Sequence, residues 1–324
     1  MKPFESFMAK QLEEYLDYRG SLGYADQSLR SCLRILDRYL QARVSRPQAL
    51  LPAFFLTMRQ ELPGAPRTVN GVLSAIRGFF GFLVRRGEYE ENPLRYIPAK
   101  QEDGYIPFIF SPEQIEQLLR AIRLRIRRDP HCFFQDLTVS MTLLLLARCG
   151  LRISEPLRLK CDHYRADERT LTICNTKFGK ERLIPLPEAA AQELNNYLAV
   201  RRSLRPADTN PLLLPGQADR PLNTSRIYAS FHQAVSDIGL TQPRRVVANL
   251  VFGAPTPHSL RHSFAVNTLK RAGQRGTPPG RTLPALSAYL GHRKYRYTAV
   301  YLKVIDAEQR QGLIDFAISR QEEL

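Results

Sequence analysis

The stretch TPHSLRHSFA, residues 256–265, brings two histidines and an arginine to the start of a predicted helix. Thr256 is a good N-cap residue and Pro257 a good first helical residue. His258 and Arg261 are then three positions apart, so they share one face of the helix. Backbone N–H groups and the helix dipole at such an N-terminus favour an anion. The stretch therefore predicts half of a phosphate-binding site.

Three further segments carry residues of the same kind. GLRISE places Arg152 directly after a nearly apolar run, and NTKFGKER places Lys177 in a predicted turn. LGHRKYRYTAVY supplies His292 and Tyr301. Each residue alone has an ordinary structural explanation, such as a surface charge or a helix end. Together they offer a chemistry, because two guanidiniums can neutralise a phosphodiester and a phenol can attack it when a base takes its proton.

The composition predicts a polyanionic partner. The chain has 324 residues, which fits one large or two ordinary domains, and its 44% hydrophobic residues can build a core. Its net charge is +16, from 47 Lys and Arg against 31 Asp and Glu. A balance this basic most simply indicates nucleic acid, although a merely basic soluble protein is the alternative.

Compartment and metal content follow from smaller signals. The longest apolar run, Leu143–Ala147, is too short to span a bilayer, and the first residues lack the apolar stretch of a signal peptide. The five cysteines are odd in number and have no CxxC spacing, which favours reduced thiols over a zinc site or disulfides. We therefore expect a cytoplasmic protein with no membrane partner and no metal site.

Hydrophobic periodicity predicts a helical bundle at the start of the chain. The apolar residues recur at helical spacing in four segments, which are Phe4–Tyr18, Asp26–Arg43, Leu50–Leu62 and Thr68–Arg85. The stretch from Glu91 then contains three prolines, both signs of charge and little periodicity. We expect a helical domain over residues 1–97, a linker over 98–107 and a second domain over 108–324.

The second domain is expected to mix helices with a little sheet. A capping box begins a helix at Ser111, and Leu137–Cys149 is apolar all round, which is typical of a buried central helix. Leu171–Leu186 holds two β-like runs around a Phe-Gly turn and predicts a hairpin, and Glu188–Arg202 is helical again. Three prolines within AGQRGTPPGRTLPALS predict a stiff connection before LGH. The fold class is thus mainly α, with an N-terminal bundle and a C-terminal mixed α+β domain that contains a small hairpin or sheet.

The motif order identifies a family resemblance. GLRISEPLRL, TKFGKERLIPLP, TPHSLRHSFA and LGHRKYRYTAVYLKV resemble the four motif regions of the tyrosine recombinase (phage integrase) family, over about residues 108–305. The N-terminal helices are similar to that family's core-binding domain, in its Xer-like two-domain type. The resemblance implies a site-specific DNA recombinase that cleaves and rejoins DNA through a covalent 3′-phosphotyrosyl intermediate, for integration, excision or transposition. It implies no cofactor, and a homo-tetramer on paired double-stranded half-sites, possibly with related recombinases.

The resemblance also implies a role for each motif residue. It gives two arginines that clamp the scissile phosphate, a lysine that protonates the leaving oxygen, two motif histidines of which the first assists the nucleophile, and a tyrosine nucleophile nine residues after the second. These positions are, in the same order, Arg152 and Arg261, Lys177, His258 and His292, and Tyr301.

The residues by themselves leave alternatives open. Tyr297 shares a helix face with Tyr301, and Tyr289 and Tyr295 also lie near, so only the family spacing selects the nucleophile. Lys180 competes with Lys177 in the same way. His262 should point about 100° away from Arg261, so we interpret it as structural. Glu155 either orients a catalytic side chain or forms a plain surface salt bridge.

Basic faces in both halves predict the contacts with the DNA backbone. The arginines concerned are Arg77, Arg85, Arg86, Arg120, Arg123 and Arg127. A linker between two basic domains predicts a clamp around DNA, and the apolar tail after Tyr301 predicts docking into a neighbouring subunit. Two other functions remain open: an accessory DNA-binding homologue without activity of its own, and an enzyme similar to type IB topoisomerases.

Overall fold

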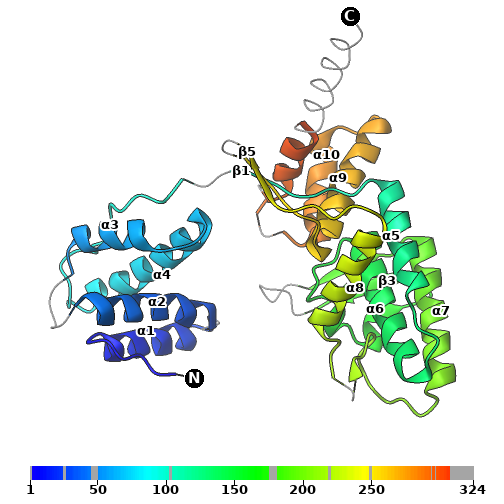
Figure 1. Cartoon of the computed structure of the whole chain (residues 1–324), viewed down its shortest axis with the longest axis horizontal. Coiled ribbons are helices and arrows are strands. Elements are labelled where there is room, and N and C mark those ends of the chain that lie inside the picture. Colours follow the sequence, from blue (N-terminus) through cyan, green and yellow to red (C-terminus); the bar gives the residue numbers. More distant parts are fainter. Residues whose placement is uncertain are drawn as a thin grey trace, which may run out of the picture. The chain divides into compact units, whose positions relative to one another are not determined.

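The computed structural model describes residues 2–24, 27–44, 50–101, 104–174, 181–217, 220–247, 250–292, 294–295 and 297–306. Lys177 and Lys180, and the tail from residue 307, lie outside the described residues. The chain forms two compact units, Met1–Gly104 and Tyr105–Leu324, each with its own hydrophobic core (Figure 1). The mainly helical fold class predicted from the sequence is confirmed.

The first unit is a bundle of helices with one apolar face each. Its helices are α1 (Ala9–Ser21), α2 (Gln27–Arg43), α3 (Pro52–Glu61) and α4 (Pro66–Arg85). Helix α1 begins five residues later than the periodicity predicts. The preceding backbone is held instead by the buried carboxylate of Asp37, which accepts from the N–H groups of Glu5 and Ser6, at 2.8 Å from the latter. A side-chain acceptor thus replaces a first helical turn there.

The stretch after α4 is tied to that helix. Arg77 donates from Nε to the carbonyl of Leu94 and from Nη2 to that of Ile97, both at 3.0 Å. Asn70 exchanges two hydrogen bonds with the backbone of Lys100, at 2.9 and 2.7 Å. Because these contacts bind proline-rich backbone to α4, residues up to 100 are part of the first unit's structure.

The second unit is built around α6 (Pro130–Cys149), which contacts α5 (Pro112–Leu124), α7 (Glu188–Leu204), α8 (Thr224–Asp237) and α9 (Pro257–Gln274) (Figure 1). Thirteen of its side chains are buried, nearly all round the helix. Within the described residues, α6 is the one helix long and apolar enough to cross a membrane, and 72% of that stretch is buried inside the protein. Its neighbours therefore explain its apolar surface. The expected capping box at Ser111 opens α5.

Two small sheets complete this unit. The predicted hairpin is present: β3 (Thr170–Ile173) pairs with β4 (Arg182–Pro185), and β2 (Tyr164–Arg165) flanks β3. The sequence did not predict the second sheet, in which β6 (Leu250–Phe252) lies between β5 (Arg245–Val247) and β1 (Gly104–Ile106). The stretch expected to be a plain linker thus ends as a strand.

The proline-containing segment before LGH is a helix, which corrects the expected stiff connection. Pro278 caps α10 (Pro279–Leu290) and Pro279 occupies its first position. Prolines fit there because the first N–H groups of a helix have no partner within it. Pro284 lies inside the helix, where its missing N–H leaves one bond unmade. A further helical segment, residues 297–306, carries Tyr301.

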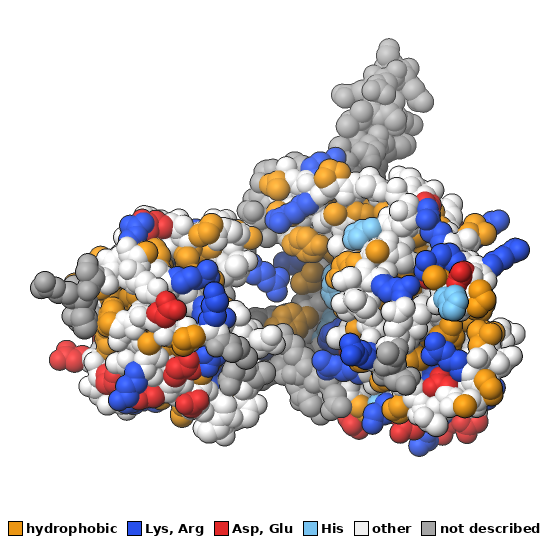
Figure 2. Space-filling model, turned by 60° about the horizontal axis from the view of Figure 1, so that its bottom comes forward, with side chains coloured by type: hydrophobic (Ala, Val, Ile, Leu, Met, Phe, Trp, Pro, Cys, Tyr) orange, Lys and Arg blue, Asp and Glu red, His pale blue; other side chains and the backbone are white. Residues whose placement is uncertain are grey.

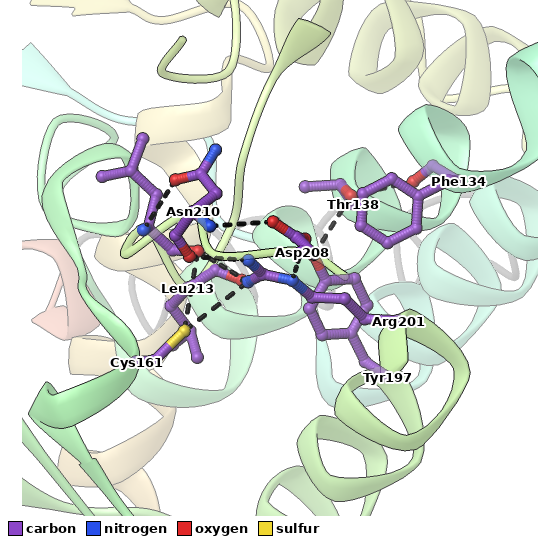
Figure 3. Close-up of polar contacts among 9 residues, drawn as sticks. Phe134, Thr138, Cys161, Tyr197, Arg201, Asp208, Asn210 and Leu213 are labelled. Atoms are coloured by element: carbon purple, nitrogen blue, oxygen red, sulfur yellow. Dashed lines mark hydrogen bonds and ion pairs between the residues drawn. The ribbon is translucent and has the colours of Figure 1, made fainter. Parts of the chain in front are cut away.

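A buried arginine fixes the loop that follows α7 (Figure 3). Arg201 is 5% exposed and donates to a carboxylate oxygen of Asp208 at 2.9 Å and to the carbonyl of Asn210 at 2.8 Å. Tyr197, one turn earlier, joins its hydroxyl to that of Thr138 on α6 at 3.2 Å. These contacts stabilise the side of the unit built from α6 and α7.

Candidate active site

Two helices end at the site, and each is followed by a backbone position that favours glycine. Gly150 follows α6 with φ +57° and Gly291 follows α10 with φ +65°, both in the left-handed region. A Cβ on Gly150 would lie 2.5 Å from the ring of Phe264. The cap of α10 bonds the carbonyls of Ser287 and Ala288, while the carbonyls of Gly150, Leu290 and Gly291 accept from arginine side chains. Carbonyls at such helix ends carry the negative end of the helix dipole.

Arg261 lies between the two helix ends. It begins the second turn of α9, is 1% exposed, and donates to the carbonyl of Gly150 and to that of Leu290, both at 2.7 Å. Burial, and then the nearby charge of Arg152, lower the pKa of the guanidinium to about 10. It remains a cation at neutral pH, stabilised by the two helix C-termini.

Arg152 lies at the same helix ends and is more open. It donates from Nη2 to the carbonyl of Gly291 at 2.9 Å and from Nη1 to a carboxylate oxygen of Glu155 at 2.9 Å. Its side chain is 30% exposed, against 6% for that of Glu155. The structure therefore brings together the two arginines that the motifs suggested, with Arg152 accessible to an anion from outside.

Glu155 is a buried bridge and not a surface salt bridge. Its two oxygens accept from Arg182 at 3.0 and 2.9 Å, and one of them also accepts from the backbone N–H of Arg152 at 2.8 Å. Burial by itself would raise the pKa of this carboxyl, but the hydrogen bonds and charge of Arg182 and the N–H of Arg152 lower it overall. Glu155 therefore stays ionised and holds Arg152 in place.

The sequence motifs did not identify Arg182 as a residue of the site. Besides Glu155, it binds the carbonyl of Tyr289 through Nε at 2.8 Å, so it joins β4 to α10 and to the end of α6. A signal was present in the strand alternation, since Arg182 and Ile184 share one face of β4. Ile184 is fully buried, whereas Leu183 between them is 58% exposed. An arginine on the buried face of a predicted strand needs an acid, and Glu155 supplies it.

Tyr301 is turned into this site. It is 3% exposed, and its hydroxyl lies 3.1 Å from Nδ1 of His262. The ring of His292 stacks on it with centroids 6.4 Å apart. Of the competing tyrosines, Tyr295 and Tyr297 are each 49% exposed. Burial raises the pKa of Tyr301, against the lowering effect of Arg261 and Arg152.

Three histidines surround the tyrosine and the arginines. His258 is exposed, and its ring lies 4.6 Å from that of His262. The expectation that His262 points away from the site is wrong. The side chain of His262 does point about 100° away from that of Arg261 around the helix axis. It follows His258 by four positions, however, so these two side chains point within about 40° of each other. The helix therefore presents His258 and His262 together.

The protein around these rings disfavours the imidazolium form. Burial first, and then the charges of neighbouring arginines and histidines, lower the pKa of His262 and that of His292 to about 3 each. The pKa of His258 is lowered too, first by the protein that surrounds part of its ring and then by the charges of Arg261 and Arg152. All three are neutral at pH 7 while the site holds no anion.

Most arginines expected at the DNA surface already have partners within the chain. Arg86 pairs with Glu14 and Glu88, Arg123 with Glu193, and Arg127 with Asp136, while Arg77 binds backbone carbonyls. Arg85 lies over the ring of Tyr18. Figure 2 displays Lys and Arg side chains on both units, interspersed with acids. Exposed pairs of this kind are worth about 1 kcal/mol or less, so phosphates can compete for them. The contacts of Arg77 are part of the fold.

These features define a class of protein: a two-unit, mainly helical chain whose second unit gathers two arginines, three histidines and a buried tyrosine at the ends of two helices. Within the described residues no group of three or more His, Cys, Asp or Glu is arranged to hold a metal ion. Residues 109–308 match the Phage integrase family, and the chain belongs to that family.

The chain is similar to named relatives over nearly its whole length. The Sinorhizobium fredii protein y4rB, named as an integrase/recombinase, is 36% identical over 298 residues, 92% of this chain and 93% of the relative. Tyrosine recombinase XerD of Xanthomonas axonopodis pv. citri is 29% identical over 303 residues, 91% and 93% of the two chains. The XerH site-specific recombinase, solved with a palindromic difH substrate in a post-cleavage complex, shares the fold with a TM-score of 0.67 at 19% identity, over 94% and 83%.

Proposed function

We propose that this protein is a site-specific DNA recombinase that cleaves one strand at a time and rejoins it to another. The observation that carries the proposal is the buried hydroxyl of Tyr301 in one constellation with Arg152 and Arg261. The net charge of +16 suits a DNA substrate. Similarity to XerD and to the substrate-bound XerH fold supports the same reaction.

The proposed reaction is a transesterification. The Tyr301 oxygen attacks the scissile phosphorus, the Oη–P bond forms, and the P–O5′ bond breaks with its electron pair going to the 5′ oxygen. Arg152 and Arg261 stabilise the non-bridging oxygens as charge grows on them. Lys177 protonates the leaving 5′ oxygen. A 5′ hydroxyl from another strand then reverses these steps. The phosphotyrosyl ester retains the energy of the broken bond, so the cycle needs neither ATP nor a metal.

The remaining site residues position and shield this chemistry. The Glu155 carboxylate accepts from both the backbone N–H and the guanidinium of Arg152, and Arg182 donates to the same carboxylate. His258, the histidine that the resemblance implies assists the nucleophile, stands exposed at the start of α9. There it can also reach a phosphate oxygen beside the helix N-terminus. His292 is fixed by Thr298, whose hydroxyl lies 2.8 Å from its Nδ1, and covers one face of Tyr301.

We further propose that four copies act on two paired half-sites in the cytoplasm, on the DNA of the nucleoid, to move or resolve a mobile element. Two units that both expose arginines suit a clamp around the duplex. A closed ring of subunits on two sites follows if each tail docks on its neighbour.

A suicide substrate, nicked so that the released strand diffuses away, tests the reaction. The wild-type chain should trap a covalent protein–DNA adduct, and Tyr301→Phe should lose the adduct while keeping specific binding. Tyr297→Phe is the matched control and should behave as wild type. If Tyr301→Phe still forms the adduct and Tyr297→Phe does not, the nucleophile is Tyr297 and the assignment of Tyr301 is wrong. Adduct formation with relaxation only would favour a topoisomerase, and binding without an adduct would favour an accessory homologue.

A further inference from the structure

We propose that His262 is the proton acceptor for the Tyr301 hydroxyl during strand cleavage, and thus a catalytic residue of the reaction proposed above. The inference rests on that function. It assigns a role to a histidine that the sequence motifs suggested was structural. The reacting oxygen itself touches this ring, which distinguishes His262 from the two motif histidines.

The geometry is that of a base already in contact with its acid. Nδ1 of His262 lies 3.1 Å from the Tyr301 hydroxyl, within the 2.6–3.2 Å reach of direct proton transfer. The two rings meet edge to face with centroids 5.7 Å apart, and the tyrosine is 3% exposed. His292 covers a ring face and directs its Nδ1 to Thr298 instead. His258 reaches solvent, and its ring packs edge to face against that of His262.

The charges around His262 keep it neutral and ready to accept. The groups that face it are His258 on its own helix, Arg261, His292 and Tyr301. Burial, and then the charges of His258, Arg261 and His292, lower its pKa to about 3. With the ring proton on Nε2, the Nδ1 lone pair accepts the phenol O–H.

A base this weak cannot ionise a phenol while the site is empty. The scissile phosphate brings a negative charge between Arg152 and Arg261, and that charge offsets the cations which disfavour an imidazolium. His262 becomes more basic at the moment when Tyr301 has a target. The arrangement keeps the nucleophile protonated until substrate is bound.

The step balances without another reactant. The phenol proton moves to Nδ1 as the Oη–P bond forms, and the leaving 5′ oxygen takes its proton from a separate acid. On rejoining, the imidazolium of His262 returns its proton to the departing tyrosine oxygen, as microscopic reversibility requires. Loss of His262 should therefore slow both cleavage and rejoining.

Single-turnover cleavage of the suicide substrate tests the assignment. His262→Asn keeps a hydrogen-bonding atom near the Nδ1 position but cannot take up the proton. We expect cleavage to slow by about 10²–10⁴-fold with unchanged DNA affinity. The rate should then rise about tenfold per pH unit above neutrality, because attack now depends on the ionised fraction of Tyr301. His232→Asn, at an exposed histidine of α8, is the matched control and should cleave at the wild-type rate.

Two results would overturn the inference. One is cleavage by His262→Asn within about threefold of wild type with the wild-type pH profile. The other is the steep pH profile appearing in His258→Asn instead. A second measurement needs no variant of His262: difluorotyrosine at position 301 of the otherwise wild-type chain lowers the phenol pKa. A base-assisted attack should gain little at neutral pH, and a gain in proportion to the ionised phenol means that no base takes the proton. Absence of a covalent adduct with the wild-type chain itself would instead reject the proposed function as a whole.

Discussion

Arg261 shows how a single residue serves both the fold and the chemistry. Its guanidinium bonds two carbonyls that end two different helices, so its position is set by main-chain atoms. Lysine has one ammonium and no fork, and cannot reach both carbonyls and a phosphate together. We expect Arg261→Lys to lose about 3 kcal/mol or more of transition-state stabilisation, measured as single-turnover cleavage with binding determined separately. Arg202→Lys, at an exposed arginine of α7 outside the predicted DNA contacts, is the control. Near-normal cleavage by Arg261→Lys would contradict the role.

Lys177 is also predicted at the scale of one residue, from its place at the hairpin tip. A substrate with sulfur in the 5′-bridging position needs no proton on leaving, because a thiolate is a good leaving group. Lys177→Ala should be slow on ordinary DNA and restored to near the wild-type rate on the sulfur substrate. Lys180→Ala serves as the comparison. Equal defects of Lys177→Ala on both substrates would move the general acid elsewhere.

At the scale of elements, Arg182 and Glu155 join β4, the end of α6 and the end of α10. Removing one partner of a buried pair leaves an uncompensated charge and costs about 3–5 kcal/mol. We expect Arg182→Gln to lose about that much free energy of unfolding and also cleavage rate. The double variant with Glu155→Gln should lose less than the sum of the two, by urea unfolding. Arg165→Gln, in an exposed pair on β2, should change little.

The pH dependence of that pair has a definite sign. The folded-state pKa of Glu155 lies below its ordinary value of 4.5, so its contribution is fully present above 4.5 and is lost as pH falls through the folded pKa. The stability advantage of wild type over Glu155→Gln should therefore shrink on acidification below about pH 4.5. An advantage that grows there would mean that Arg182 does not hold this carboxylate ionised.

The elements also mark what a sequence can predict. Alternation in LTI and RLIP predicted the β3–β4 hairpin, and periodicity predicted the four helices of the first unit. The β5–β6 pair escaped because RRVVANLVFG has no strong turn dipeptide. Helix α10 escaped because prolines suggest a break, although two of its three lie where a helix start accepts them. Local patterns found the arginines, but the contacts of Glu155 with Arg182 and of Tyr301 with His262 join distant segments and needed the fold.

At the scale of the whole molecule, the two units predict a bipartite grip on DNA. Each unit alone should bind weakly, and the joined chain tightly, because binding of one unit raises the effective concentration of the other. Affinity of the full chain should fall steeply with salt as counterion release weakens. Titrations of residues 1–104, 105–324 and the full chain at two salt concentrations check this. Equal affinity of the isolated second unit and the full chain would refute the grip.

The tail beyond residue 306 predicts how copies assemble. Its sequence contains Leu313, Ile314, Phe316 and Ile318, and apolar residues in so short a segment need a further surface to bury them. Deleting residues from Ala307 onward should spare binding to one half-site but abolish the joining of two sites, seen by gel shift and strand-exchange assays. Mixing this deletion with Tyr301→Phe should partly rescue cleavage if tails are donated between subunits. Normal recombination by the truncated chain would mean that the tail folds on its own unit.

The main-chain setting of Arg152 and Arg261 has a consequence for altering target choice by laboratory evolution. Their partners include the carbonyls of Gly150, Leu290 and Gly291, which no substitution can remove outright. Libraries that vary exposed side chains outside this centre can therefore search for new base contacts, which specify the DNA sequence, without disturbing the reaction centre. The two glycines should be kept, because their backbone is in the left-handed region, where a side chain causes strain. A useful library would diversify the surface broadly and leave Gly150 and Gly291 untouched.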